Sequence, residues 1–342
     1  MDEQSQSGKR TAKPGLVALC FFGVTLLCLL LTLLGVIWVM EKGPSPTATA
    51  IFCRSVRETS AIRWVSGIFL SEEELEQYKS VSTENMETEA VNTSLIHLSS
   101  AESSGAEIEV LDIAEGSCKG KLIIVPDPKQ VILGISGTFQ TEPGKQLTEI
   151  VAQYDGLGGI NAGGFNDEGG RGDGSTPQGV VIYKGELIWG DAENVYNMIG
   201  LDADGILHVG NMSGNEALAL GMQWGVSFRT HDGLASSLII NGEVQTQNLG
   251  SGVNPRTAIG QRADGALLLL VLDGRSISTL GATMQDLCDL MLEYGAVNAG
   301  NLDGGSSSVM VYDGEIINHC ASVTGPRRIP TAFVVLKEEY NG

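Results

Sequence analysis

The sequence has few basic residues, and this scarcity argues against one large class of partners. Its 342 residues contain 21 lysines and arginines against 41 aspartates and glutamates, for a formal net charge of −20. A protein that binds nucleic acid needs a basic face for the phosphate backbone, so we expect no nucleic-acid partner. Small anionic substrates remain open, because a few local arginines can hold a phosphate on an acidic protein.

Several signatures of catalysis and metal binding are also missing. The sequence contains no Gly-x-Ser-x-Gly nucleophile elbow and no Walker A loop. Asp202-Ala-Asp204-Gly205 begins like a calcium loop but lacks the later ligands, so it predicts a β-turn. The histidines lack metal-ligand spacing; they are His97, His208, His231 and His319.

The six cysteines form no CxxC pattern, which argues against a metal cluster. Cys288 lies on the apolar side of a predicted helix and is expected to be a buried free thiol. The sequence leaves open whether Cys118 and Cys320 form a disulfide.

One apolar run, residues 16–40, contains no charge and can cross a bilayer, which takes roughly 20 apolar residues. Three basic residues precede it, so the positive-inside rule places residues 1–15 in the cytoplasm and the rest outside. A cleaved signal peptide is the alternative, because the small residues at 48–50 resemble a cleavage site. The run exceeds the usual h-region of about 7–15 residues, which favours an uncleaved, single-pass anchor in the cell membrane with an extracellular C-terminal domain.

The rest of the chain divides into two parts. Residues 41–106 are expected to be a linker or stalk, beginning with the linker-like "GPSPTATA" at 43–50. Ser71 followed by Glu74 is a capping-box pattern and predicts a short helix there. From residue 107 to 342, strand-like runs alternate with turns, and this predicts one globular domain.

A short apolar stretch in the predicted stalk has two possible locations. Trp64-Val65 and Ile68-Phe69-Leu70 either lie at the membrane surface or dock on the main domain. The sequence does not distinguish between them.

One arrangement occurs twice in the globular part: a helix, a strand, an Asn-Ala-Gly corner, a glycine-rich loop and a hairpin. The corners are "GGINAGGFND" at 158–167 and "GAVNAGNLDG" at 295–304, and the two preceding helices are predicted to end at Gly156 and Gly295. The hairpins at 180–188 and 309–317 also match. We therefore predict an α+β fold: a single domain of mixed sheets with a pseudo-duplicated helix–strand–loop–hairpin unit, preceded by one transmembrane helix.

The loop "NLDGGSSS" at 301–308 carries groups that can bind an anion or a sugar. It combines the Asp303 carboxylate with two glycines and three serine hydroxyls, although an ordinary tight turn is the alternative. Arg256 and Arg327 each precede a strand-like run, and their planar guanidinium groups suit a phosphate; a surface ion pair is the alternative for each. Together these residues suggest one shared anion-binding pocket.

Four motifs occur in a fixed order: "INAGGF" (160–165), "NPRTAIG" (254–260), "VNAGNLDGGSSS" (297–308) and "PRRIPTAFVV" (326–335). In this order and approximate spacing they resemble the phosphodiester glycosidase family, over roughly residues 107–338. Many bacterial members carry the label of exopolysaccharide biosynthesis proteins. The resemblance implies cleavage of a sugar C1–O bond whose leaving group is the phosphate of a phosphodiester.

The resemblance carries over to individual positions of this chain. Two positions depart from the family's motifs, because Gly164 replaces a Phe and Ser306 replaces a Gly, and these changes put the identity of the sugar in doubt. The matching positions are Asn161, Gly163, Phe165, Arg256, Thr257, Asp303, Gly304, Gly305, Ser307 and Arg327.

The resemblance also implies roles for these residues. A phosphate leaves easily, so the strong general acid of ordinary glycosidases is less necessary. Arg256 and Arg327 are expected to hold the phosphate as charge builds on it. Asp303 is the expected nucleophile, general base or sugar-hydroxyl ligand, and Asn161 and Thr257 are expected to orient the substrate. The remaining glycines, Phe165 and Ser307 are assigned to substrate binding.

No cofactor and no metal are expected. Asp167 and Asp173, in the first long loop, are candidates for a second carboxylate or for holding a divalent cation such as calcium, without a clear motif.

The combined prediction is a membrane-anchored extracellular hydrolase that cleaves a sugar-1-phosphodiester in envelope or exopolysaccharide metabolism. Its expected partners are a phosphorylated glycan substrate and, through residues 16–40, the membrane. One alternative is a non-catalytic surface module that binds phosphorylated or acidic glycans. Another is an adhesion protein that uses Arg171-Gly172-Asp173.

Overall fold

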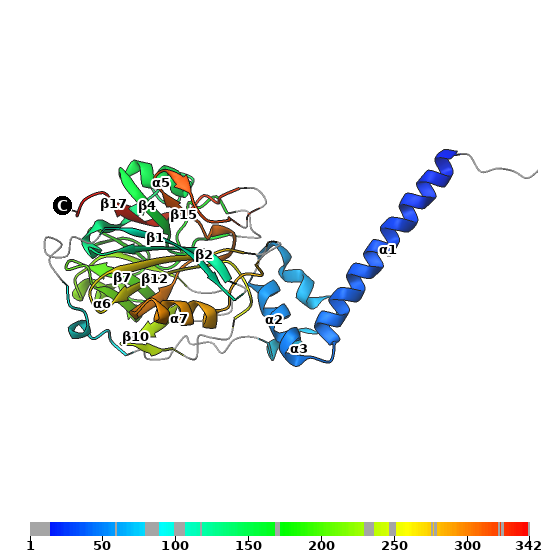
Figure 1. Ribbon diagram of the computed structural model, residues 1–342, viewed down its shortest axis with the longest axis horizontal. Coiled ribbons are helices and arrows are strands. Elements are labelled where there is room, and N and C mark those ends of the chain that lie inside the picture. The colour runs from blue at the N-terminus through cyan, green and yellow to red at the C-terminus, as the bar shows by residue number, and fades with distance from the viewer. Residues whose placement is uncertain are drawn as a thin grey trace, which may run out of the picture.

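The computed structural model describes residues 14–58, 60–78, 89–98, 107–116, 118–167, 172–228, 236–245, 251–274, 276, 279–320, 322 and 325–340. Figure 1 shows a globular domain, a small group of short helices beside it, and one long helix, α1 (Pro14–Lys42), that projects away from both.

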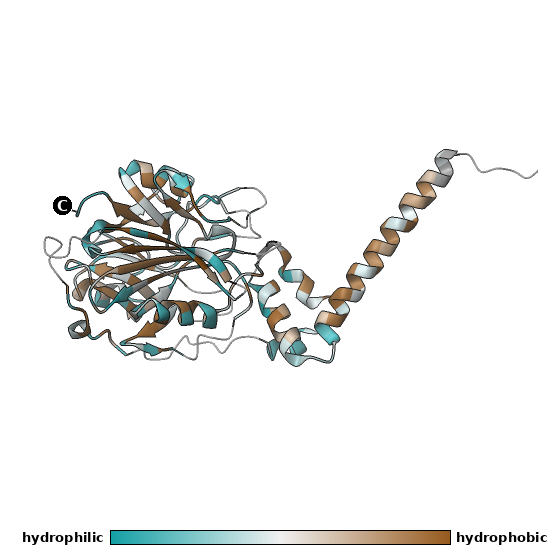
Figure 2. Ribbon diagram, viewed as in Figure 1, coloured by the Kyte–Doolittle hydropathy of each residue, from teal (hydrophilic) through white to brown (hydrophobic). Residues whose placement is uncertain are grey.

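Helix α1 is apolar on all sides along most of its length, as Figure 2 shows. Residues Ala18–Lys42 have a mean hydropathy of 2.7 within their most apolar window and are almost entirely exposed, so they are long and apolar enough to cross a membrane. A helix with these properties near the N-terminus is compatible with a single-pass anchor and equally with a signal sequence.

The segment after α1 is helical, which corrects the predicted linker at 43–50. Ser45 caps α2 (Pro46–Arg57) by accepting a hydrogen bond from the Ala48 N–H, and Pro46 occupies a first-turn position where its missing N–H costs nothing. The 3₁₀ helix η1 (Ser60–Gly67) and α3 (Glu72–Glu76) follow. Ser71 and Glu74 form the predicted capping box at the start of α3.

The domain contains three antiparallel sheets. The seven-stranded sheet has the order β1 (Glu109–Glu115), β2 (Cys118–Val125), β13 (Leu267–Leu272), β12 (Arg256–Arg262), β14 (Ala296–Asn301), β10 (Ser237–Ile240) and β11 (Glu243–Val244). The second sheet has the order β16 (Glu315–Ile316), β15 (Met310–Tyr312), β4 (Gly156–Asn161), β17 (Thr331–Leu336) and β3 (Val131–Ile135). The third has the order β6 (Glu186–Trp189), β5 (Val181–Tyr183), β9 (Met222–Ser227), β7 (Val195–Asp202) and β8 (Leu207–Ser213).

Short helices complete the domain and cover the sheets. They are η2 (Thr93–Leu95), η3 (Pro128–Gln130), α5 (Leu147–Gln153), α6 (Gly214–Ala219), α7 (Met284–Glu293) and η6 (Gly305–Ser307). This mixture of helices and sheets in one domain, after one apolar N-terminal helix, confirms the predicted fold class.

Strand β13 shows that the seven-stranded sheet lies between two hydrophobic cores. All six of its residues are apolar and buried, because both faces of the sheet are covered. Leu267, Leu269 and Val271 belong to the core shared with the other two sheets. The alternate residues, including Leu268 and Leu270, pack in a second core with α7.

The predicted duplicated unit is present in both places. The first copy runs α5, β4, loop, β5 and β6, and the second runs α7, β14, loop, β15 and β16. Both hairpins turn through two residues of positive φ, Lys184-Gly185 and Asp313-Gly314, as the favoured two-residue turns require. The copies interlock, since β15 of the second pairs with β4 of the first.

The two helix ends of the unit differ. Gly295 follows α7 with a φ of 84° and terminates it as predicted. Gly156 does not terminate α5: the helix ends at Gln153, Asp155 takes the positive φ, and Gly156 already belongs to β4. A Cβ at Gly156 would lie 2.5 Å from the Val334 side chain, so close packing against β17 is the reason for glycine there.

Candidate active site

The two Asn-Ala-Gly corners meet at Asp303. The Asp303 N–H donates to the carbonyl oxygen of Ala162 in the first corner, at 3.0 Å. In the other direction, Asn161 Nδ2 donates to the Asp303 carbonyl oxygen at 2.5 Å. The first corner therefore holds the loop of the second corner through both the N–H and the carbonyl oxygen of Asp303.

Asn161 is a buried junction between three segments. Its Oδ1 accepts hydrogen bonds from Thr257 Oγ1 at 2.9 Å and from the Val309 N–H at 3.1 Å, while its Nδ2 bonds Asp303. Asn161 and Thr257 are both almost fully buried. Their geometry suits positioning of the Asp303 loop, which differs from the direct contact with substrate that the sequence suggested.

The carboxyl group of Asp303 is strongly perturbed by its surroundings. Its pKa is raised to about 7, chiefly by burial and in smaller part by the nearby Asp167 charge. Hydrogen bonding by the Ser307 side chain, the Arg327 charge and the Gly304 N–H act in the opposite direction without cancelling the effect of burial. A carboxyl group that changes its charge near neutral pH is suited to proton transfer.

Arg327 lies beside this carboxyl group and is held by Asp167. Its guanidinium forms a bidentate pair with the Asp167 carboxylate at 2.7 and 3.0 Å, which keeps the pKa of Arg327 raised. Arg327 also donates to Ser306 Oγ at 3.2 Å, and its guanidinium carbon lies 5.4 Å from the centre of the Phe165 ring. We call Asp303, Ser306, Ser307, Arg327, Asp167 and Phe165 the Asp303 cluster.

The hydrogen bonds of Arg256 are made to residues outside the Asp303 cluster, so the shared pocket for both arginines stays a prediction. Its guanidinium is buried and pairs with Glu58, at the end of α2, at 2.8 Å. It also donates to the carbonyl oxygens of Gly252 and Ala282. The backbones are nonetheless adjacent, because the Gly305 N–H donates to the carbonyl of Pro255 at 3.0 Å.

The Glu58 carboxylate occupies a ready-made anion cradle. The Gly252 N–H donates to it at 2.6 Å, Asn254 Nδ2 at 2.8 Å, and Arg256 supplies the charge. Donors that converge in this way on a buried carboxylate can also hold a phosphate oxygen. Arg256 is therefore part of a group of donors that can bind an anion.

The glycines assigned to substrate binding have structural reasons to be glycine. At Gly163, an added Cβ would lie 3.0 Å from Val226 Cβ, and the Gly163 N–H bonds Thr331. At Gly164, where the family has a Phe, an added Cβ would lie 3.0 Å from the Phe228 ring. Gly304 approaches the Pro255 carbonyl, and Gly305 has a φ of 62° in open space.

Other sequence candidates lie apart from this cluster. Asp173 lies in an exposed turn, where hydrogen bonds from the Ser175 side chain and from the Ser175 N–H lower its pKa. Asp202 accepts bonds from the Asp204 and Ile206 N–H groups, so the predicted β-turn is confirmed. The tripeptide at 171–173 begins at a residue outside the described part of the chain.

Cys53, Cys118 and Cys288 are buried, and no disulfide joins Cys118 to Cys320. Burial raises the pKa of Cys288 to about 12, which agrees with the inert buried thiol expected there. Among the described residues, no group of three histidine, cysteine or carboxylate side chains is arranged to hold a metal ion.

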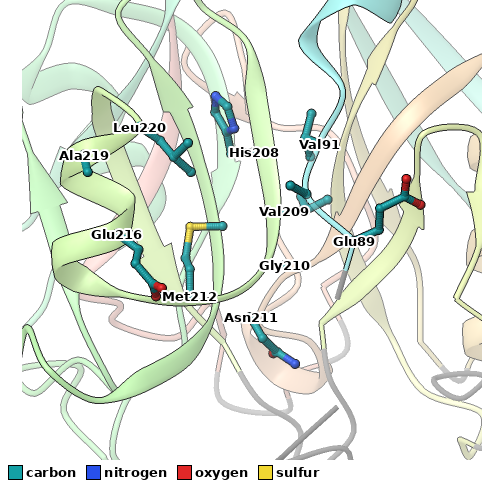
Figure 3. Close-up of a pocket in the computed structure, with 11 residues that line it drawn as sticks. Glu89, Val91, His208, Val209, Gly210, Asn211, Met212, Glu216, Ala219 and Leu220 are labelled. Atoms are coloured by element: carbon teal, nitrogen blue, oxygen red, sulfur yellow. The ribbon is translucent and has the colours of Figure 1, made fainter. Parts of the chain in front are cut away.

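A separate cavity of about 380 Å³ lies between β8, α6 and the segment 89–91 (Figure 3). Val91, Val209, Met212 and Leu220 give it an apolar wall, and His208 lies at its edge. None of the predicted site residues lines it. No local pattern predicts this cavity, because its walls come from segments far apart in the chain.

Two contributors to the site were underestimated or missed from sequence. Asp167 was a weak candidate because nothing local distinguished it from the neighbouring loop residues, whereas the structure pairs it with Arg327. Glu58 lies in the predicted stalk and was not considered. The only available signal was the Ser45-Pro46 helix start, which marks this segment as folded.

Comparisons with known proteins agree with this architecture. A sequence model of the phosphodiester glycosidase family matches residues 155–336. Over 66 residues the chain is 47% identical to the prophage-derived protein YomE of Bacillus subtilis, covering 19% of this chain and 10% of that protein. Over 89 residues it is 34% identical to the bovine N-acetylglucosamine-1-phosphodiester alpha-N-acetylglucosaminidase, covering 24% and 17%.

A solved structure shares the fold. The zebrafish N-acetylglucosamine-1-phosphodiester alpha-N-acetylglucosaminidase catalytic domain, auto-inhibited by its pro-peptide, superimposes with a TM-score of 0.58 at 20% identity, covering 71% of this chain and 87% of that one. The matches to the curated relatives span less than a fifth of their length. The family match covers more than half of this chain and includes both corners, so the chain belongs to the phosphodiester glycosidase family, a family of hydrolytic enzymes.

Proposed function

We propose that this protein hydrolyses sugar-1-phosphodiesters, breaking the bond between the sugar C1 and the phosphate oxygen. The observation that carries the proposal is the Asp303 carboxyl group, with a pKa raised to about 7, beside the Arg327 charge at the junction of the two corners. Water supplies the oxygen that bonds to C1, and the phosphate leaves as a monoester. Asp303 acts as general base or nucleophile, and both roles require its ionised form.

Arg327 stabilises this reaction through its charge. Its terminal nitrogens already bond Asp167, Ser306 and Gly172, so we assign it to supporting negative charge at the site through a fixed, partly buried guanidinium. Asp167 holds that guanidinium in place. Phe165 lies against it and offers an apolar face for a sugar ring.

We place the protein at the cell membrane, anchored by α1 with its domain outside, and its substrate among phosphorylated glycans of the envelope or exopolysaccharide. The apolar length of α1 and the basic residues before it support this placement. The identity of the sugar follows from neither.

The test is product analysis with the full chain in detergent. We expect release of free N-acetylglucosamine, or another reducing sugar from a panel of sugar-1-phosphodiesters, together with one equivalent of phosphomonoester. Retention of the intact compound without turnover across the panel would instead support a non-catalytic glycan-binding module.

We further propose that the cradle around Arg256 is the phosphate subsite and that Glu58 fills it until the α2 segment moves away. A phosphate can replace the Glu58 carboxylate because it accepts the same donors from Gly252, Asn254 and Arg256. The adjacency of Pro255 and Gly305 brings this cradle next to the Asp303 loop.

Replacement of Glu58 tests this assignment. Glu58→Ala is expected to raise kcat/KM by about tenfold. While Glu58 fills the subsite the substrate cannot bind, so the apparent affinity for substrate is reduced in proportion to the fraction of molecules whose subsite is open. Glu73→Ala, which removes an exposed glutamate of the same segment, serves as the matched control and should leave kcat/KM unchanged. An unaltered kcat/KM in a folded Glu58→Ala protein would show that Arg256 is a structural anchor.

A further inference from the structure

Helix α1 is longer than the hydrocarbon core of a bilayer. Its 25-residue candidate span corresponds to about 37 Å, against about 30 Å for the hydrocarbon core. If the helix spans the membrane, as proposed above, this extra length lets its last turns lie at the level of the lipid headgroups. These turns contain Ile37 and continue to Lys42.

The short helices after α1 are held against these last turns. Ile37 is buried by them, although the rest of α1 is largely exposed. Glu41, also buried, accepts a hydrogen bond from the Phe69 N–H at 2.8 Å, and Lys42 forms an ion pair with Glu74 at 2.5 Å. These contacts hold η1 and α3 near headgroup depth.

At this depth, η1 presents a large apolar surface to its surroundings. Trp64 is 70% exposed and Ile62 is 38% exposed, with Arg63 exposed between them. The two tryptophans of the globular domain differ, because Trp224 is buried and the Trp189 indole donates to the Pro177 carbonyl. An exposed tryptophan with an adjacent arginine is typical of a membrane–water interface, where the indole combines apolar area with a polar N–H.

The charge of α2 and η1 is locally basic, whereas the adjacent α3 contains four glutamates. The segment 46–67 contains three arginines and one glutamate, and that glutamate is paired with Arg256. The chain as a whole has a net charge of −20. Of the three arginines Arg63 is the exposed one, and a positive charge beside a candidate span complements anionic lipid headgroups.

We propose that η1 is an interfacial membrane platform, in which Ile62 and Trp64 insert among the headgroups and Arg63 contacts anionic lipid. The occupant of this apolar surface is the bilayer that α1 crosses. The inference rests on the proposed membrane anchoring. It resolves the open position of the Trp64 stretch in favour of the membrane, and it holds the start of the domain near the bilayer instead of on a free stalk.

The experiment places the full-length protein in vesicles of neutral and anionic phospholipid, with brominated acyl chains as quenchers of tryptophan fluorescence. The Trp64→Phe variant is expected to lose at least a third of the quenched signal of the wild type. Trp189→Phe, which removes a tryptophan of the domain, is the matched control and should leave the quenched signal unchanged.

Trp38, in α1, separates failure of the platform from failure of the anchor. In one outcome, the quenched signal falls in Trp38→Phe but is unchanged in Trp64→Phe. This result would overturn the platform while leaving the anchor in place. Absence of quenching at both tryptophans would overturn the anchor, and the platform with it. Ile62→Ser combined with Arg63→Glu should reduce Trp64 quenching at least twofold if the surface is inserted, and a full signal in that variant would contradict the proposal.

Discussion

The Asp303→Asn variant is expected to lose about 10²- to 10⁴-fold in the rate of sugar release, the range typical for removal of a positioned proton-transfer group. Asparagine has nearly the same shape as aspartate and keeps an acceptor for Ser307, but it cannot ionise. The measurement is kcat with saturating sugar-1-phosphodiester. Circular dichroism on the same samples checks that the variant is folded, and unchanged kcat in a folded variant would remove Asp303 from the mechanism.

The same residue predicts the pH dependence of activity. The pKa of Asp303 is raised from its usual 3.8 to about 7, chiefly by burial, so the ionised form is scarce in acid and predominates only above about pH 7. Activity that requires this form should rise with pH through about 7 and then level off. The residual activity of Asp303→Asn should lack this rise, and a wild-type rate that is constant across the range would contradict the role of Asp303.

Stability should change in the opposite direction. An unfolded Asp303 ionises near its usual pKa, whereas the folded protein retains the proton to about pH 7. Between these values the folded state binds more protons, so its stability falls as the pH rises. Asp303→Asn should remove this loss and be more stable than the wild type above about pH 7, as expected where a site trades stability for function. Melting temperatures measured across this range test the sign.

The Asn161→Ala variant is expected to lower the free energy of unfolding by about 3–6 kcal/mol. The substitution leaves the Thr257 hydroxyl, the Val309 N–H and the Asp303 carbonyl without their partner in a buried region, and each unsatisfied group costs about 1–3 kcal/mol. Urea denaturation measures the change. Asn166→Ala, at an exposed position in the same corner, is the matched control and should change stability by less than about 0.5 kcal/mol.

Activity in the Asn161→Ala variant should also fall, because the tether on the Asp303 loop is lost. A positioning role predicts that stability and kcat decline together, with the rise of activity near pH 7 broadened or displaced as the surroundings of Asp303 relax. Full stability combined with lost activity would instead support direct contact between Asn161 and the substrate.

Local features of the fold were readable because they depend on neighbours in sequence. The capping box at Ser71, the end of α7 at Gly295 and the hairpin at 309–317 each depend on residues within one or two turns of the chain. The repeated Asn-Ala-Gly corners were readable for the same reason. Gly156 shows the limit of such reasoning, because its small size is required by Val334, a residue distant in sequence.

The sequence by itself determined the apolar span, the duplicated unit and the motifs that identify the family, since each is a pattern of neighbouring residues. Only the tertiary structure decided which charges meet. Arg327 pairs with Asp167 in the loop after the first corner, and Arg256 pairs with Glu58 from the predicted stalk. Side chains at strand ends find their partners through the packing of whole sheets and helices, and no local pattern encodes that choice.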